Sequence, residues 1–233
     1  MADRKSDCLA DLRSRILTMA LAPGADLEEA ALTERYGLSR TPLREVLQRL
    51  AGEGFVRIES NRGAAVSSMN VDVMRTFFQT APLIYSSVAR LAAEHRTGPQ
   101  LDELKQVQAA FADAVGAARP EDMALKNHRF HEIIGEMAAN DYLTPSLRRL
   151  LIDHTRLGQV FYRPASPAES LAVKKAADQH DAMIAAIEAR EAGVVVDLTL
   201  QHWDLSRDRM ERFVRPDPLP LNVIEMKESA RAL

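Results

Sequence analysis

A helical pattern runs almost unbroken from about residue 71 to residue 215, and it limits the fold more than any other feature of the chain. Alanine, leucine, methionine, glutamate and arginine dominate this stretch, and the alternation of apolar and polar residues that marks strands is missing. The pattern predicts an all-helical bundle of about six helices. Five short segments divide it: TGPQ (97–100), ARPED (118–122), ANDY (139–142), RPASPAES (163–170) and REAG (190–193).

The first 70 residues have a different texture, in which short helices mix with turn signals and strand-like pieces. The change falls near SSMNVD (67–72), whose polar residues are also suited to capping the next helix. We therefore expect one domain over 1–70 and a helical domain over 71–215. PDPLPLN (216–222) ends the last helix, and residues 216–233 are expected to form a loosely held tail.

Within the first domain, residues 31–66 predict a helix, a tight turn, a second helix and a hairpin. Gly37 is suited to end the first helix in the left-handed conformation. Ser39 and Thr41 are both suited to cap the second helix, and Pro42 is tolerated in its first turn. Four apolar residues then fall at i, i+3, i+4 and i+7, which predicts one buried stripe: Leu43, Val46, Leu47 and Leu50.

The opposite side of the second helix carries polar groups that suit DNA. Arg40 lies near its N-terminal end and Arg44 one turn later, and arginine fits both phosphates and the edge of guanine. Residues 35–62 contain six arginines against three acids, whereas the first 70 residues balance ten basic against ten acidic residues. The strand-like FVRIES and GAAVSS flank a turn with a basic tip, Asn61-Arg62-Gly63, which reads as a wing. The alternative is a small helical core with a solvated arginine face.

Composition excludes several other classes of protein. The net charge of −3 argues against a wholly basic surface. The single cysteine, Cys8, excludes an internal disulfide framework and fits a reducing compartment. The N-terminus lacks a signal-like apolar run, and no stretch approaches the roughly 20 apolar residues of a membrane span. We expect a cytoplasmic protein that does not enter a membrane.

In the helical domain, histidines occupy positions where apolar residues are the usual choice. Asn127 and His131 lie four residues apart beside an inner face formed by Met123, Phe130, Ile134 and Met137, whereas His128 is expected to face solvent. His180 shares a face with Val173, Ala176, Ile184 and Ile187. His202 shares one with Val195, Leu198, Leu205 and Phe213.

Three imidazoles directed into one bundle need a proton or a metal to share, because an unpaired buried polar group costs roughly 1–3 kcal/mol. With one oxygen ligand and open positions, such a set suits a divalent transition metal: zinc, nickel or manganese. The alternative is that each histidine is a hydrogen-bonded core residue.

The stretch PGADLEEAALTERYGLSRTPLREVLQRLAGEGFVRIESNRGAAV resembles the winged helix-turn-helix of GntR-type bacterial transcription regulators. With an all-helical second domain of this length, residues 8 to about 214 resemble the FCD branch of that family. The fold implied is mainly α, an N-terminal winged helix-turn-helix domain followed by an FCD-like helical bundle. The resemblance implies that Arg40, Thr41 and Arg44 touch bases or phosphates, that Ser39 and Pro42 shape the helix start, and that Asn61, Arg62 and Gly63 make the wing contact. Ala30 departs from a relative that carries a DNA-contacting arginine there.

FCD domains hold a metal with an Asp-x-x-x-His pair on one helix and one histidine from each of two later helices. By resemblance this ligand set falls on Asn127, His131, His180 and His202, with a neutral amide in place of the carboxylate. The resemblance further implies a homodimer on a pseudo-palindromic operator and a small-molecule effector, such as an organic acid. Tyr85, His154 and Arg156 are candidates to line the effector pocket, and Trp203 is expected to pack between helices. His154 shares an apolar face with Leu147, Leu150 and Phe161, so a plain core histidine is the alternative for this residue.

The segment ARLAAE (89–94) also resembles the family. One common form of the family carries an arginine and a glutamate where this chain has Ala81 and Tyr85, and Pro82 is expected to bend or loosen the helix there. Without that arginine we expect a more apolar acid, or a neutral oxygen ligand that chelates the metal and contacts Tyr85. If Arg156 took over the clamp, a simple dicarboxylic or sugar acid would remain suitable.

The leading hypothesis is a ligand-responsive transcription factor. A metal-dependent hydrolase with an accessory DNA-binding-like domain is the alternative, since a three-histidine site with an open position can activate water. The chain shows no HExxH spacing, nucleophile elbow or phosphate loop to support it. A third hypothesis is a structural DNA-binding dimer whose histidines only pack.

Overall fold

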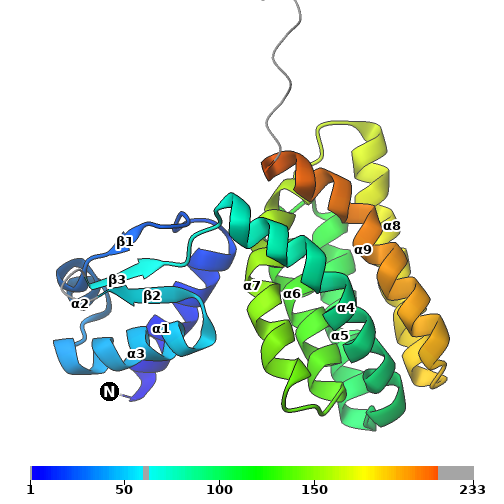
Figure 1. The fold of residues 1–233 in the computed structure, drawn as a ribbon, viewed down its shortest axis with the longest axis horizontal. Helices are drawn as coiled ribbons and strands as arrows, with labels where there is room; N and C mark the ends of the chain where they lie inside the picture. Colours follow the sequence, from blue (N-terminus) through cyan, green and yellow to red (C-terminus); the bar gives the residue numbers. More distant parts are fainter. Residues whose placement is uncertain (1, 60–62, 215–233) are drawn as a thin grey trace, which may run out of the picture.

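The N-terminal part combines helices with a small antiparallel sheet (Figure 1). The structure is a computed structural model that describes residues 2–59 and 63–214, so the tail expected at 216–233 lies outside the described residues. The helices are α1 (Ala2–Leu17), α2 (Glu29–Tyr36) and α3 (Arg40–Glu53). The strands are β1 (Asp26–Leu27), β2 (Val56–Glu59) and β3 (Gly63–Val66).

The hairpin expected after α3 is present, and the sheet gains a strand that the sequence did not predict. β2 pairs antiparallel with β3, with Val56 opposite Val66 and Glu59 opposite Gly63. The two-residue β1 adds to the other edge of β3, which gives the order β1-β3-β2. A strand of two residues is too short to show periodicity, so only pairing with β3 reveals it.

The helix-turn-helix follows from local sequence signals. Gly37 ends α2 with φ +60°, the left-handed conformation that glycine adopts without strain. Ser39 is the N-cap of α3, although its side chain makes no capping hydrogen bond, and Thr41 lies inside the first turn and is not a cap. The expected stripe on α3 is buried against α1 and the sheet: Leu43, Val46, Leu47 and Leu50.

Six helices form the rest of the described chain, and each expected break separates two of them (Figure 1). Asn70 caps the first of these helices, because its Oδ1 accepts from the backbone N–H of Val73 at 2.9 Å. That helix continues through Pro82 without interruption. The bounds are α4 (Val71–His95), α5 (Gly98–Gly116), α6 (Pro120–Met137), α7 (Leu143–Phe161), α8 (Pro167–Glu188) and α9 (Ala192–Val214).

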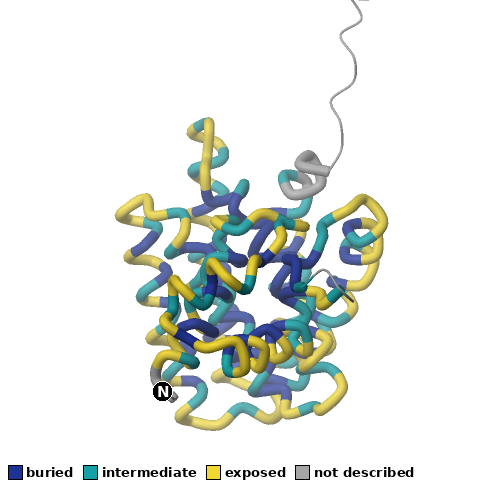
Figure 2. The backbone as a smooth tube through the Cα atoms, turned by 90° about the vertical axis from the view of Figure 1, so that its left-hand side faces the viewer, coloured by how far each residue is buried: buried dark blue, intermediate teal, exposed yellow. Residues whose placement is uncertain are grey.

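These helices bury their inner faces in a shared core, seen as dark segments inside the exposed outer turns in Figure 2. α4 packs against α6, α7 and α9, while α5 packs against α6 and α8. None of the helices in residues 2–59 and 63–214 combines the length and apolarity needed to cross a bilayer.

The two parts meet along α7. Ile152 of α7 belongs to the apolar core of the N-terminal part. Gln159 donates from Nε2 to the carbonyl of Leu17 at 3.2 Å, and Arg156 donates from Nη2 to the carbonyl of Ser67 at 2.7 Å. α7 therefore supports the end of α1 and the segment that leads into α4.

Candidate functional site

The exposed side of α3 presents the residues that the sequence marked for DNA. Arg40, Thr41 and Arg44 are exposed, and Pro42 is half-buried in the first turn. Gly63 opens β3 with φ +84°, a conformation that favours glycine. Asn61 and Arg62, the other two expected wing residues, lie outside the described residues.

Several charges on this surface are paired within the protein. Arg44 donates from Nε to both carboxylate oxygens of Glu29, at 3.0 and 3.2 Å. Glu45 pairs with Lys5 of α1. The acids beside α3 are therefore neutralised by cations of the same domain.

Inside the helical domain, His131 of α6, His180 of α8 and His202 of α9 converge. One ring nitrogen of each lies within 4.8 Å of the other two, and all three residues are buried. The distance from Nε2 of His180 to Nε2 of His202 is 3.3 Å. Phe130 stacks on the His180 ring with centroids 3.9 Å apart, which helps to fix its orientation.

Hydrogen bonds determine which nitrogens of this histidine cluster carry protons. Gln108 donates from Nε2 to the carbonyl of Ala177 at 3.0 Å, which leaves its Oε1 facing Nδ1 of His180 at 2.9 Å. An amide oxygen only accepts, so Nδ1 of His180 carries the proton and Nε2 keeps a lone pair. Oε1 of Gln179 lies 3.1 Å from Nδ1 of His202 and has the same effect there.

Two lone pairs therefore face each other between His180 and His202. Burial holds the pKa of both histidines below the usual range, to about 4 for His202, so protonation does not remove the conflict at neutral pH. A metal ion would remove it, because two nitrogens bound to zinc at about 2.0–2.1 Å with tetrahedral geometry lie roughly 3.4 Å apart.

Asn127 and His131 each add a buried polar atom without a partner. Oδ1 of Asn127 and Nε2 of His131 are buried and have no hydrogen-bond partner among the described residues. Buried polar atoms without a partner are costly unless a ligand satisfies them. Burial, followed by the neighbouring histidines, holds the pKa of His131 well below its usual value. Three imidazoles whose nitrogens lie within 4.8 Å of one another suit a divalent transition metal, and the amide of Asn127, one helical turn before His131, is of a kind that can add an oxygen ligand.

An aromatic wall lies against the histidine cluster. The hydroxyl of Tyr85 lies 2.5 Å from Nδ1 of His154, and burial keeps the pKa of Tyr85 well above its usual value, so the hydroxyl donates. The rings of Tyr85 and His154 lie 5.5 and 5.8 Å from that of His131. Trp203 packs on both residues, as expected for a residue between helices, and its buried Nε1 has no partner in the described part.

Arg156, the third candidate for the effector pocket, is directed elsewhere. Its buried guanidinium donates from Nη1 to Oδ1 of Asp153 at 3.0 Å and from Nη2 to the carbonyl of Ser67. The structure brings Tyr85 and His154 to the histidine cluster and places Arg156 at the junction of the two parts.

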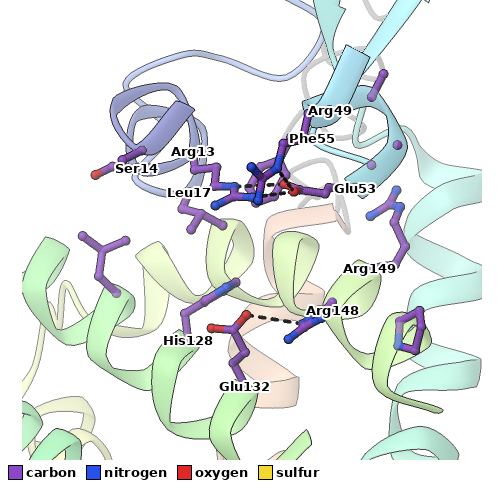
Figure 3. A pocket seen from close by; sticks show the side chains of 16 residues that line it. Arg13, Ser14, Leu17, Arg49, Glu53, Phe55, His128, Glu132, Arg148 and Arg149 are labelled. Atoms are coloured by element: carbon purple, nitrogen blue, oxygen red, sulfur yellow. Dashed lines mark hydrogen bonds and ion pairs between the residues drawn. The ribbon is translucent and has the colours of Figure 1, made fainter. Parts of the chain in front are cut away.

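The expectation that His128 faces solvent is wrong. His128 is half-buried, and its Nδ1 lies 2.8 Å from Oγ1 of Thr155 on α7. It lines a cleft of about 860 Å³ between α1, α3, α6 and α7, together with Arg13, Glu132 and Arg148 (Figure 3). The helix phase was correct, but α7 and the N-terminal part cover the side that looked free.

Comparison with known families agrees with this architecture. The description "FCD domain" matches residues 78–205, and "Bacterial regulatory proteins, gntR family" matches residues 5–66. The chain belongs to the GntR family and carries an FCD domain.

Similar GntR-family proteins are named as regulators. The HTH-type transcriptional repressor RspR of Escherichia coli (strain K12) is 26% identical over 191 residues, which cover 82% of each chain. The gluconate operon transcriptional repressor of Bacillus subtilis (strain 168) is 21% identical over 203 residues, covering 86% of this chain and 82% of its own. The solved structure of E. coli McbR/YncC shares the fold, with a TM-score of 0.76 and 20% identity over 92% of this chain and all of that one.

The protein is therefore a transcription regulator of the GntR and FCD type and not an enzyme. The metal-dependent hydrolase considered as an alternative is excluded. The site agrees with this result, because Glu132 and Glu136 bind Arg129 at 2.7 and 2.8 Å on a different side of α6 from His131.

Sequence reasoning missed the two glutamines of this GntR-family site. Gln108 and Gln179 orient His180 and His202, and both are buried. The available signal is the same as for Asn127 and the histidines: a polar residue on an otherwise apolar helix face.

Proposed function

We propose that this GntR-family protein is a ligand-responsive regulator that binds a pseudo-palindromic operator as a homodimer. α3 would enter the major groove with Arg40, Thr41 and Arg44, while Ser39 and Pro42 shape its start and the wing of Asn61, Arg62 and Gly63 makes a flanking contact. Two-fold symmetry of the protein would match the symmetry of the operator. DNA binding places its action in the cytoplasm.

We further propose that Asn127, His131, His180 and His202 hold a divalent metal, with zinc, nickel and manganese as candidates. The observation that carries this proposal is the pair of Nε2 lone pairs 3.3 Å apart, beside the orphaned Oδ1 of Asn127 and Nε2 of His131. Gln108 and Gln179 would support two of the ligands from the second coordination shell. A bound metal supplies a Lewis acid that anchors an oxygen of the effector.

The effector is proposed to lie against Tyr85, His154 and Trp203. One neutral donor of this wall, Nε1 of Trp203, has no partner among the described residues. The Tyr85 hydroxyl donates its proton to His154, and its oxygen can still accept a hydrogen bond. Arg156 is left out of this site, because its guanidinium is held by Asp153 and Ser67. An acid with a substantial apolar part, or a neutral oxygen ligand, suits such a wall better than a small polyanion.

One helix links the effector site to the DNA-binding domain. α7 carries His154 at the aromatic wall, and two and five residues later it carries Arg156 and Gln159, which bind the N-terminal part. A shift of α7 on effector binding would move the support of α3 and the wing. Coupling free energies of this kind are typically about 1–3 kcal/mol.

Two variants separate the two halves of this proposal. His180→Ala should lose bound metal, measured by elemental analysis of protein purified without a histidine tag, and should remain dimeric. Arg40→Ala should keep the metal and weaken operator binding by roughly 1–3 kcal/mol if the side chain reads a base. Undiminished metal in His180→Ala, or undiminished operator binding in Arg40→Ala at fixed salt, contradicts the corresponding half.

A further inference from the structure

The contact between α2 and α3 on the side proposed to face DNA joins an acid, Glu29, to Arg44. Glu29 is the first residue of α2, and its carboxylate receives two contacts from Nε of Arg44, at 3.0 and 3.2 Å. The Arg44 side chain is 64% exposed, whereas that of Glu29 is 26% exposed. The carboxylate thus lies deeper than the guanidinium that it holds.

We propose that Glu29 determines DNA sequence specificity by orienting Arg44, an inference that rests on the proposed role of α3 in DNA recognition. A guanidinium has five N–H donors, and the carboxylate occupies the single donor on Nε. Within the described residues, neither Nη1 nor Nη2 of Arg44 is hydrogen-bonded to a protein group. The end of the fork that carries these two nitrogens is left for DNA.

The contact between Glu29 and Nε of Arg44 selects one mode of base recognition. Arginine binds guanine by donating two hydrogen bonds to O6 and N7, and it uses either both terminal nitrogens or Nε with one of them. With Nε held by Glu29, only the approach through Nη1 and Nη2 remains. Adenine offers one acceptor and one donor at the same edge, so a group that only donates discriminates against it. Glu29 is therefore a positioning residue for guanine recognition by Arg44.

Electrostatics give a reason to look for such a role. A carboxylate near phosphates opposes DNA binding. The exposed acid of α3, Glu45, is neutralised by Lys5. At position 30, the next residue of α2, this chain has alanine. The N-terminus of α2 therefore influences recognition through Glu29 and Arg44 and does not add a guanidinium of its own.

The fold keeps the two residues in register. Gly37, with φ +60°, fixes the tight turn between α2 and α3. Leu32 and Leu43 are both buried in the core beneath the two helices. The position of Glu29 relative to Arg44 is set by this packing before DNA arrives, as preorganised recognition requires.

The test is selection of binding sites from a random duplex library with the full-length protein. Wild type, Arg44→Ala, Glu29→Ala and Glu29→Gln are each used for selection, followed by affinity measurements on the selected and on scrambled duplexes at several salt concentrations. Glu34→Ala is the matched control, because it removes the same charge from an exposed position of the same helix. Thermal unfolding of every variant shows whether the fold is retained.

We expect Arg44→Ala to lose a guanine from the selected motif and Glu29→Ala to relax the preference at that same position. Glu29→Ala should bind the wild-type site about tenfold more weakly, yet bind scrambled duplexes about twofold more tightly, because a negative charge has been removed. Glu29→Gln should keep the guanine, since its amide oxygen also accepts from Nε. Glu34→Ala should strengthen scrambled binding in the same way and leave the motif unchanged.

Opposite changes in specific and non-specific binding separate a positioning role from a structural one. If the role of Glu29 were structural, Glu29→Ala would weaken both kinds of binding together and lower the unfolding temperature. An unchanged motif and unchanged specific affinity for Glu29→Ala overturn the inference while the proposed function stands. Failure of the wild-type protein to select any motif overturns the proposed function and the inference with it.

Discussion

Removal of the Asp153 carboxylate should loosen the DNA-binding domain from the helical domain. Asp153 accepts from Arg156 at 3.0 Å and from Arg149 at 2.8 Å. The side chains of Arg156 and Asp153 are 0% and 4% exposed. Arg156 also donates to the carbonyl of Ser67, whose hydroxyl in turn donates to the carbonyl of Gly54 at 2.7 Å. Asp153 is therefore the counter-charge of a guanidinium that holds the segment leading into α4.

The expected effect of Asp153→Ala is large for a single substitution. Breaking a buried ion pair by removing one partner typically costs about 3–5 kcal/mol, because the remaining charge stays buried. The bond from Arg156 to Ser67 survives and Arg149 is free to turn toward water, which favours the lower end, about 3 kcal/mol. For a chain of 233 residues, that amounts to a fall of roughly 6–12 °C in unfolding temperature.

Thermal unfolding followed by circular dichroism, with hydrogen exchange of residues 52–67, measures the effect and its location. Asp204→Ala is the control, since Asp204 forms an exposed pair with Arg207 at 2.9 Å and the same spacing of three residues. Its removal should cost no more than about 0.5 kcal/mol. The double variant Asp153→Leu/Arg156→Met, which removes both charges, should recover more than half of the loss. An Asp153→Ala protein as stable as the Asp204→Ala control would refute the reasoning, as would a double variant less stable than the single one.

Three further predictions concern the helical domain. Asn127→Asp should tighten metal binding, because a charged carboxylate replaces a neutral amide oxygen. His128→Ala should leave the metal content unchanged. If Asn127→Asp retains metal no better than wild type under a chelator challenge, residue 127 does not reach the metal. Metal-free protein should lose stability as the pH falls from about 6.5 toward 4. Burial lowers the pKa of His202 to about 4 in the folded protein, so the unfolded chain binds protons first, and each such histidine contributes up to about 1.4 kcal/mol per pH unit. Equal denaturant midpoints at pH 7.5 and 5.5 would contradict this. In a thermal-shift screen with and without metal, hydrophobic acids or neutral chelating oxygen ligands should stabilise the protein, and metal-dependent stabilisation by small sugar acids alone would count against the proposed effector class.

Local signals in the sequence were sufficient for the helices and for the inward-facing histidines. The periodicity of α6 placed Asn127 and His131 on one buried side, and the breaks at residues 97–100 and 139–142 separate the helices as expected. Gly37 ended α2 as its conformational freedom predicts. Each of these features depends on residues within a few turns of one another, which is the range over which a periodic pattern or a cap carries information.

Contacts between distant segments were decided by tertiary structure alone. A helical projection correctly turned His128 away from the core side of α6 but did not show that α7 covers that side. Arg156 looked like a partner for an anionic effector, yet the fold brings Ser67, 89 residues earlier, against its guanidinium. Gln108 meets His180 across 72 residues, and the pairing of Glu29 with Arg44 depends on the turn geometry at Gly37.

The sequence by itself determined the fold class, the family and the residues available for a metal and for DNA, because these follow from periodicity, caps and short motifs. Tertiary structure decided the proton positions on His180 and His202, the support of the DNA-binding domain by α7 and the partner of Arg44. The physical reason is that hydrogen bonds and ion pairs extend over only about 3–4 Å. Whether two polar groups come that close depends on how whole helices pack, and a one-dimensional pattern does not contain that information.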